Sequence, residues 1–428
     1  MNKCIYLLFY KTSLKPYQPR CLNFLRACSQ IVDTLRRYSD KPAIILGIET
    51  SCDDTGCGIV DITGKILGEA IHSQHAIHRI HGGIIPTLAS QFHRENITTV
   101  CENALKSANL RLRDIDAIAT TTKPGLPNSL NIGNTFGKYL SRIGNKPYIP
   151  IHHMEAHALT VRMIQKVDFP YLVLLLSGGH SLLAIVDSVD KFYTLGTTTD
   201  NAVGEILDKI ARRLKLVNIP EFLHMSGGQA IESAACRATD PKKFEFPSII
   251  TRKRDCQFSF AGVWTKSIKY IASQEKEFEI DTNKLIPDAY NLCASLQWAI
   301  AKHICLRLQR AMEFIDKMNL IPHEKRTLVI SGGVACNDFF AKAFEIVCSE
   351  KGFQLVRTPH RLCNDNGVMI AWNGAERWIA NVGVIRDRNK IEAVTIENKV
   401  PLGENWIEKV RAANIKCKVV KLKALMTC

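Results

Sequence analysis

Two histidines four residues apart are the side chains whose type and spacing most directly suggest chemistry. His153 and His157 lie in the run His-His-Met-Glu-Ala-His at 152–157, where a helical pattern begins that extends over 154–165. On a helix this spacing puts both rings on one face, with Cβ atoms about 5–6 Å apart. Two such imidazoles suit one divalent metal ion. A bare pair of this kind also occurs as surface or capping histidines, so the pair alone leaves both interpretations open.

A carboxylate near the end of the chain offers the missing oxygen ligand. Asp365 lies in Asn-Asp-Asn-Gly at 364–367, and we expect it at the N-cap of a last helix that runs to about residue 379. It either only caps this helix or binds the metal together with His153 and His157. Two histidines and one carboxylate leave coordination positions open, as in catalytic rather than structural sites.

Two Ser-Gly-Gly turns each follow an apolar run. Ser177-Gly178-Gly179 comes after residues 172–176, and a second turn at 331–333 comes after residues 327–330. Glycine lets the backbone approach a ligand, and free N–H groups can bind phosphate, although tight turns also use glycine for steric reasons alone. With the acidic, hydroxyl-rich turn at 49–55, the pattern indicates a two-lobed nucleotide clamp. Neither a P-loop nor a dinucleotide-binding glycine motif is present.

The elements expected to position these residues alternate between strands and helices. We predict a long helix from Pro86 to about residue 108 and another that ends near residue 142. Strands are predicted at 43–48, 57–60, 65–70, 115–121, 172–176, 182–186 and 327–330, and helices at 202–215, 228–238, 261–273 and 288–318.

Composition narrows the class of protein. The chain has 428 residues, a net charge of +15 and fifteen cysteines without a C-x-x-C pair. This argues against a disulfide framework or a zinc ribbon and for a reducing compartment. No apolar run is long enough to predict a membrane span. The basic balance suits an anionic partner such as RNA, although charge alone is weak evidence.

The N-terminus has the composition of a targeting segment. Residues 1–32 carry five basic side chains and no acidic one, and Arg-Arg-Tyr-Ser at 36–39 resembles a processing region. We predict that residues 1–40 are a mitochondrial transit peptide; the alternative is a basic tail.

Nine motifs in one order carry a family resemblance that spans about residues 43–400. They are 49–55 (Glu-Thr-Ser-Cys-Asp-Asp-Thr), 82–90, 123–126 (Lys-Pro-Gly-Leu), 152–157, 175–180 (Leu-Leu-Ser-Gly-Gly-His), 200–209, 258–262 (Phe-Ser-Phe-Ala-Gly), 331–337 and 363–367. Together they resemble the tRNA N6-adenosine threonylcarbamoyltransferase family, and the N-terminal extension resembles its mitochondrial branch.

The resemblance implies an α/β fold with two lobes of the actin/Hsp70/sugar-kinase type, in which mixed sheets flanked by helices enclose a central cleft. It implies transfer of a threonylcarbamoyl group from threonylcarbamoyl-AMP, made by a separate synthase, to tRNA. The acceptor would be N6 of the adenosine 3′ of the anticodon in mitochondrial tRNAs that read codons beginning with A. A homodimer in the mitochondrial matrix, without membrane insertion, is also implied.

The resemblance also assigns residues. The metal ligands, for iron or zinc, fall on His153, His157 and Asp365. Asp53 or Asp54 could accept the amine proton, with a merely acidic turn as the alternative. Contacts to the donor nucleotide fall on Leu175, Leu176, Ser177, Gly178, Gly179, Asp208, Gly228 and Asn337.

Three departures from the family pattern put particular positions in doubt. Asp54 stands where the family usually has Glu, and Trp264 where many members have Lys. Pro220 is not followed by the usual Gly-Gly-Pro, which makes the assignment of Gly228 the least secure.

Two other classes of enzyme share parts of the pattern. A metalloprotease would use the histidine pair, but Glu155 is at the wrong offset for His-Glu-x-x-His and would point away from a bound substrate. An ATPase or sugar kinase would use the clamp but gives no reason for the pair. As a place for RNA contact we predict the basic loop at Arg252, Lys253 and Arg254.

We expect four segments along the chain. They are the transit peptide (1–40), lobe I (41–165 with 366–402), lobe II (166–365) and a basic tail (403–428) without an assigned structure.

Overall fold

The computed structural model describes residues 41–246, 253–281, 283–422 and 425, so the predicted transit peptide lies outside the described residues. Three antiparallel strands begin the first sheet: β1 (Ile44–Glu49), β2 (Asp54–Asp61) and β3 (Ile66–Ser73). β4 (Ala117–Lys123) and β5 (Tyr148–His152) then add in parallel on the other side of β1, which gives the order β3-β2-β1-β4-β5.

The second sheet repeats this arrangement. β6 (Tyr171–Leu176), β7 (Ser181–Ser188) and β8 (Lys191–Thr197) are antiparallel, and β9 (Thr327–Ser331) and β10 (Gln354–Arg357) add in parallel next to β6. The order β10-β9-β6-β7-β8 mirrors that of the first sheet, and the short strand β11 pairs with β8. The predicted α/β class with two mixed sheets is confirmed. We call the first sheet with its helices lobe I and the second lobe II.

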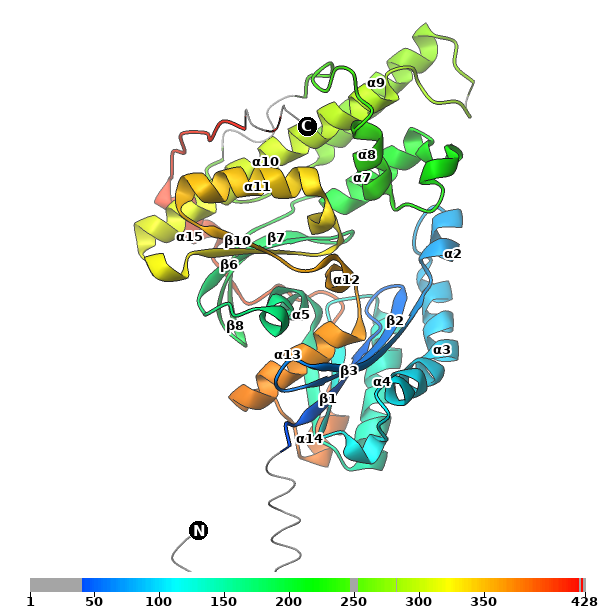
Figure 1. Ribbon diagram of the computed structural model, residues 1–428, viewed down its shortest axis with the longest axis vertical. Coiled ribbons are helices and arrows are strands. Elements are labelled where there is room, and N and C mark those ends of the chain that lie inside the picture. Colours follow the sequence, from blue (N-terminus) through cyan, green and yellow to red (C-terminus); the bar gives the residue numbers. More distant parts are fainter. Residues whose placement is uncertain (1–40, 247–252, 282, 423–424, 426–428) are drawn as a thin grey trace, which may run out of the picture. The chain divides into compact units, whose positions relative to one another are not determined.

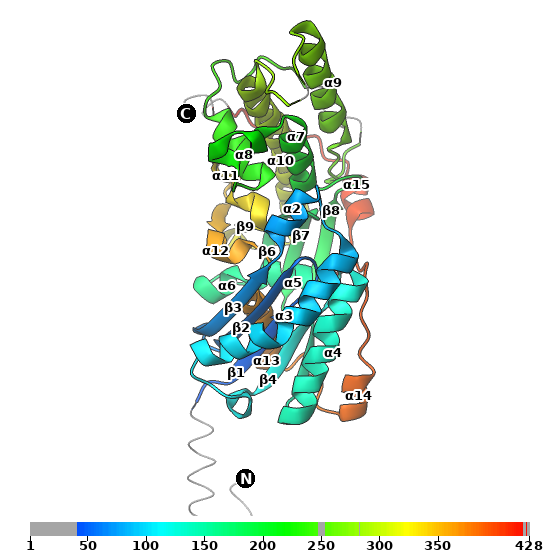
Figure 2. The same ribbon diagram turned by 90° about the vertical axis from the view of Figure 1, so that its right-hand side faces the viewer.

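Helices lie on both faces of each sheet (Figures 1 and 2). In β6, Leu172, Leu174 and Leu176 face the core of lobe II, whereas Val173 and Leu175 face the layer between the sheets, as the two-residue period of a strand requires. The outer face of the first sheet is covered by α3 (Pro86–Ser107) and α4 (Pro127–Gly144). Two helices lie between the sheets, α5 (His153–Leu159) and α13 (Gly367–Ala380). The outer face of the second sheet is covered by α7 (Val203–Arg213), α8 (Gly227–Ala235), α10 (Ala289–Met318) and α11 (Asp338–Lys351).

The remaining helices are short or peripheral. They are α2 (His75–Ile80), α6 (Val161–Ile164), α9 (Ala261–Glu277), α12 (His360–Cys363), α14 (Arg388–Glu392) and α15 (Ile407–Ala413). None of the helices in the described part of the chain is long and apolar enough to cross a membrane.

Three glycines allow α13 to lie directly on β1 and β2. A Cβ at Gly47 would come within 2.1 Å of the Ala371 nitrogen, and one at Gly58 within 2.3 Å of the Val368 nitrogen. At Gly367, a Cβ would lie 2.3 Å from the backbone of Gly58. This close packing fixes the residues just before α13, which include Asp365.

The C-terminal segment, for which the sequence predicts no structure, packs on lobe II. β11 (Glu404–Asn405) extends the second sheet, and Val410 of α15, Leu422 and Leu425 are buried in the lobe II core. β8 and β10 were also not predicted from the sequence. The predicted lobe boundaries stay a prediction.

Candidate metal and nucleotide site

Three strands of lobe I end at one edge and deliver polar residues there. β1 ends at Glu49, β4 at Lys123 and β5 at His152, and the three strands run parallel. The carboxyl ends of parallel strands are the usual place for a ligand site in α/β proteins.

α5 begins immediately after β5 and presents the histidine pair. The ring nitrogen Nδ1 of His152 accepts a hydrogen bond from the Met154 N–H at 3.2 Å and so caps the helix. His153 and His157 are both buried, with ring centroids 4.7 Å apart and ring planes at 85°. The predicted helix over 154–165 is divided at Thr160 into α5 and α6.

Asp365 lies against both histidines. Its Oδ1 is 3.0 Å from Nε2 of His157 and 3.4 Å from Nε2 of His153, and the three possible ligand atoms all lie within 4.8 Å of one another. The prediction that Asp365 occupies the N-cap of the last helix is wrong. Asn366 occupies it and accepts a hydrogen bond from the Met369 N–H at 2.9 Å. The carboxylate of Asp365 is therefore available to the histidines.

Glu49 supports His153 from behind, a role that the sequence analysis did not assign. Its Oε2 lies 3.2 Å from Nδ1 of His153 and accepts a hydrogen bond from the Thr121 hydroxyl at 2.5 Å. Its Oε1 accepts from the Ser51 N–H at 2.5 Å. A carboxylate on one ring nitrogen turns the other toward a metal. A glutamate at the end of an apolar strand was the available signal.

The charges in this cluster reinforce one another. Burial alone would lower the pKa of His153, but the carboxylates of Asp365 and Glu49 raise it well above 6.5. Burial would likewise raise the pKa of Asp365, and His153 and His157 hold it well below 3.8. A metal bound here would displace the His153 proton, because metal ligation requires neutral imidazole.

The acidic turn between β1 and β2 is held by a buried histidine of α3. His93 lies 2.7 Å from the Thr55 hydroxyl through Nδ1 and 3.0 Å from the Cys52 carbonyl through Nε2. Burial raises the pKa of Asp54 to about 7. Its Oδ1 is buried and has no hydrogen-bond partner within the described residues. Asp53, also on this turn, is half-buried.

The two Ser-Gly-Gly turns lie side by side at the ends of β6 and β9, where Leu175 pairs with Ser331. Gly332 has φ +96°, and a Cβ there would meet the Leu176 carbonyl oxygen at 2.4 Å. Gly178 and Gly179 face open space, because a Cβ added at either glycine would have no described atom within 4 Å. The first turn therefore leaves room for a ligand, whereas the second is a packing corner.

His180 places the first turn close to the histidine pair. Burial, followed by the charges of His153 and His157, lowers the pKa of His180 to about 4. Its backbone N–H donates to the Ser177 hydroxyl at 3.1 Å, and its carbonyl accepts from the Ser177 N–H at 2.8 Å.

Three further predicted contacts, Asp208, Gly228 and Asn337, lie on α7, at the start of α8 and at the N-cap of α11. α7 touches the turn, since a Cβ at Gly204 would lie 2.7 Å from the Ser177 carbonyl oxygen. One turn further along α7, the Asp208 carboxylate accepts the N–H groups of Gly227 and Gly228 at the start of α8. Asn337 is buried, caps α11 through the Phe340 N–H at 2.9 Å and donates to Gln297 at 2.8 Å. Its amide is thus already occupied.

Other features bear on the alternatives. Glu155 forms a buried ion pair with Arg377 at 2.6 Å, so it is not available as a protease base. In the predicted basic loop, Arg252 lies outside the described residues, Lys253 is exposed, and Arg254 donates to the Asn414 side chain at 2.7 Å. Trp264 packs against the lobe II core.

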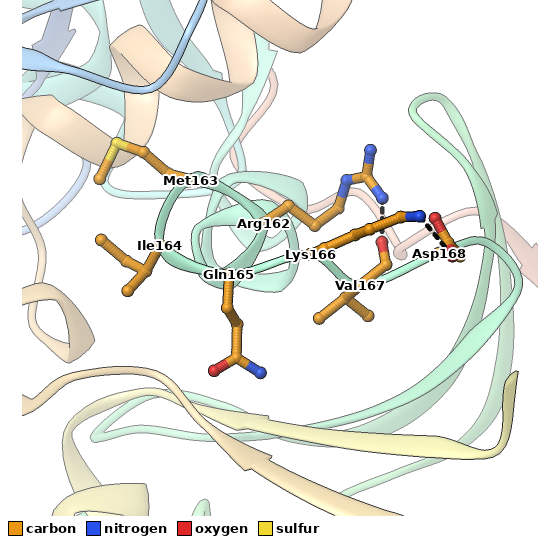
Figure 3. A pocket seen from close by; sticks show the side chains of 7 residues that line it. All are labelled: Arg162, Met163, Ile164, Gln165, Lys166, Val167 and Asp168. Carbon is orange, nitrogen blue, oxygen red and sulfur yellow. Dashed lines mark hydrogen bonds and ion pairs between the residues drawn. The ribbon is translucent and has the colours of Figure 1, made fainter.

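A pocket of about 430 Å³ lies outside this cluster, at the turn after α6. It is lined by residues 162–168, none of which is a predicted site residue (Figure 3). The Arg162 side chain is occupied by the Val167 carbonyl and by Glu376, at 2.7 Å. This arrangement indicates a structural turn.

One family model and several known proteins are similar to this chain. Residues 65–372 match the family model described as tRNA N6-adenosine threonylcarbamoyltransferase. Proteins named mitochondrial tRNA N6-adenosine threonylcarbamoyltransferase are similar: that of Danio rerio is 46% identical over 90% of this chain and 94% of its own length, and that of Homo sapiens is 44% identical over 97% and 100%. Among solved structures, component A of the (R)-2-hydroxyglutaryl-CoA dehydratase of Acidaminococcus fermentans covers 79% of this chain and 99% of its own, at 13% identity and a TM-score of 0.43.

Proposed function

The chain belongs to the tRNA N6-adenosine threonylcarbamoyltransferase family and is an acyltransferase, and from this premise we propose its substrates and the role of its site. The donor is threonylcarbamoyl-AMP, supplied by a separate synthase. The acceptor is N6 of the adenosine 3′ of the anticodon in mitochondrial tRNAs that read codons beginning with A. The products are the N6-threonylcarbamoyl adenosine and AMP.

The convergence of His153, His157 and Asp365 carries the proposal. These residues fit a divalent metal because their ligand atoms lie within 4.8 Å of one another and Glu49 orients the His153 ring. The nitrogen and oxygen donors suit iron or zinc. When bound, the ion would supply Lewis-acid polarisation and hold an oxygen-bearing end of the donor.

The first Ser-Gly-Gly turn is the proposed donor site. Ser177, Gly178 and Gly179 offer backbone and hydroxyl groups to the AMP phosphate, and the space beside both glycines supports this role. Leu175 and Leu176 fix the turn as the end of a buried strand. Asp208 and Gly228 would contact the nucleoside from α7 and α8. Asn337 would act through the cap of α11 rather than through a free amide.

Residues of the acidic turn would handle the proton. The adenine amine attacks the carbamoyl carbon, the bond from this carbon to the phosphate oxygen breaks, and AMP leaves with the bonding pair. The amine proton is transferred to a carboxylate. Asp54 suits this step, because a pKa of about 7 balances proton uptake and release near neutral pH. Asp53 is the other candidate on the same turn.

We place the enzyme in the mitochondrial matrix and propose that it works as a homodimer. The names of the relatives support the mitochondrion. The basic composition, with a net charge of +15, supports an RNA substrate.

Two alternative activities fit less well. A metalloprotease needs a general base beside the metal, and Glu155 is paired with Arg377 instead. An ATPase or sugar kinase would leave the histidine pair and its supporting Glu49 without a role. Incubation with casein or with ATP alone tests these activities.

Mass spectrometry of tRNA nucleosides tests the proposal. Purified protein is incubated with threonylcarbamoyl-AMP and tRNA, and wild type is compared with His153→Ala. Modified adenosine from the wild type and little from the variant is the expected result. Modified adenosine from both wild type and His153→Ala would contradict the proposed role of the metal site. No product from folded, metal-loaded wild type with a competent tRNA would overturn the proposed reaction.

A further inference from the structure

A second pocket, of about 350 Å³, lies at the far end of α4 and is rich in positive charge. The end of α4 and the segment around α14 form its walls. The two helices lie side by side in Figure 2. Its cations are Lys138, Arg142, Lys146, Arg386 and Arg388.

Neutral groups, not carboxylates, bind these cations. Within the described residues, none of the five forms an ion pair with Asp or Glu, so their charges are not neutralised locally. The two lysines donate to backbone carbonyls: Lys138 to those of Glu392 and Val394, and Lys146 to that of Arg113. Arg386 donates to the Asn381 amide oxygen, and Arg388 to the Asn145 amide oxygen. Arg386 also lies over the Trp378 ring, and Arg142 over the Tyr139 ring.

Acidic residues are few around the pocket. Residues 127–147, which include all of α4, contain no Asp or Glu. Glu392 lies in the lining, and Asp387 caps α14 through the Lys390 N–H at 2.9 Å. The cations thus exceed the carboxylates, and the exposed side chains of Arg142, Arg386 and Arg388 keep their charge accessible to a partner. Such a surface attracts phosphate.

α4 connects this pocket to the proposed reaction centre. The helix begins next to the acidic turn, where the Leu126 N–H donates to the Ser51 carbonyl at 2.8 Å. It then continues for 18 residues, which corresponds to about 27 Å at 1.5 Å per residue, and ends at Gly144 beside the pocket. A polyanion that reaches from one end of α4 to the other would contact both places, whereas a small anion would contact only one.

We propose that this basic pocket binds the phosphodiester backbone of the tRNA substrate, in the stem next to the anticodon loop, while the target adenosine occupies the site at the other end of α4. The proposal rests on the proposed function, since it takes tRNA as the substrate. Phosphate contacts of this kind position the RNA without reading its sequence. The pocket therefore contributes to tRNA affinity and leaves the chemical step to the residues beside Ser51.

The test removes charge from the pocket in the full-length protein. The variant R386Q/R388Q is compared with K317Q/K418Q, which removes the same charge from exposed lysines of lobe II. We expect the KM for tRNA to rise about tenfold in R386Q/R388Q, with kcat and the KM for threonylcarbamoyl-AMP unchanged. The dependence of tRNA binding on salt should weaken by about one to two units of slope. The lobe II variant should stay within about twofold of wild type.

The length of the RNA gives a second measurement. An oligonucleotide limited to the anticodon loop cannot reach the pocket, so R386Q/R388Q should bind it as wild type does. Arg142→Gln serves as an independent variant if R386Q/R388Q has a lowered melting temperature. Unchanged tRNA KM and salt dependence in both variants would overturn the proposal. A second result would also overturn it: the variants lose the thermal stabilisation that inorganic phosphate gives the wild type, while their tRNA KM stays unchanged. This result would indicate a site for a small anion. An inactive wild type would instead contradict the proposed function.

Discussion

The proposed metal cluster of lobe I and the glycine turns of lobe II are built in opposite ways. His153, His157 and Asp365 are side chains held by other side chains, with Glu49 behind them and carboxylate–histidine contacts of 3.0–3.4 Å. The turn at Ser177–Gly179 offers mainly backbone, and its two glycines face open space. One half of the site thus depends on residue identity and the other on the absence of side chains.

This difference predicts how each half responds to mutation. Removing a side chain from the metal cluster removes a ligand or leaves a buried charge unpaired, and both are costly. At Gly178 and Gly179 of the turn there is no side chain to remove. There, damage comes from added atoms. The following substitutions use this contrast, in order of decreasing expected effect.

His157→Ala should have the largest effect. It removes a buried residue that we propose as a metal ligand. Because loss of a supporting partner already costs about 10–100-fold in metal affinity or activity, loss of a ligand should exceed about 100-fold. Metal content by mass spectrometry and tRNA modification should fall together. His323→Ala, on an exposed 3₁₀ turn, is the matched control and should keep both. A variant that retains activity without metal would remove the metal from the proposed mechanism.

Asp54→Asn should lower the rate by about 100-fold, the scale of a lost general base. In wild type the rate should rise as pH passes about 7, because the carboxylate must be ionised to accept a proton. The raised pKa of Asp54 also makes the free energy of unfolding depend on pH. Between pH 4 and 7 the folded state holds a proton that the unfolded state lacks, so stability falls as pH rises through this range.

Rate profiles and thermal unfolding between pH 5 and 8 check both parts. The stability loss and the rise in rate should be absent from Asp54→Asn and present in Asp168→Asn, an exposed carboxylate outside the site. An unchanged pH–rate profile in Asp54→Asn would contradict the role of Asp54 as proton acceptor and favour Asp53.

Strong local patterns made most of the fold predictable. The continuous apolar run of β6 and the long helical periodicities of α3 and α10 are visible in the sequence. β8 and β10 were missed because their residues alternate weakly and lie toward the edge of the sheet. β10 pairs with β9 through residues that are far apart in the sequence, such as Gln354 and Thr327, and no local pattern reports this pairing. β8 instead forms a hairpin with the preceding strand β7, in which Ser188 pairs with Lys191.

The site was predictable where it is local and not where it is assembled. The spacing of His153 and His157 on one helix suggested a metal site, although the pair alone left surface or capping histidines as an alternative. Asp365 is 208 residues from His157, and the residues alone left its role open between a helix cap and a metal ligand until the family resemblance assigned it as a ligand. Asp365 and Asn366 are both good capping residues, and the glycine contacts of α13 with β1 and β2, rather than side-chain preference, decide where the helix starts.

Glu49→Gln should have a smaller effect than removal of a ligand. The substitution keeps the size of the side chain but removes the charge that faces Nδ1 of His153. Metal affinity should fall by about 10–100-fold, and excess metal should restore activity. Metal titration followed by tRNA modification measures this. Rescue by metal in Glu49→Gln, together with its failure in His157→Ala, separates a supporting residue from a ligand. Equal failure in both would assign Glu49 a direct role.

The two glycine turns give the smallest expected effects and the sharpest contrast. Gly178→Ala adds a methyl group to open space, so the melting temperature should stay near that of wild type while the KM for threonylcarbamoyl-AMP rises several-fold. Gly332→Ala places a Cβ 2.4 Å from the Leu176 carbonyl oxygen at a φ of +96°, which should cost about 1–3 kcal/mol of stability. Thermal unfolding and the KM for threonylcarbamoyl-AMP are measured on both variants. If the first turn binds the donor and the second only packs, Gly178→Ala changes the KM and not the stability, and Gly332→Ala changes the stability. An unchanged KM for threonylcarbamoyl-AMP in Gly178→Ala would indicate that the donor phosphate does not bind at this turn. The likeness of the two Ser-Gly-Gly motifs would then reflect the repeated sheet order of the two lobes and not a shared ligand.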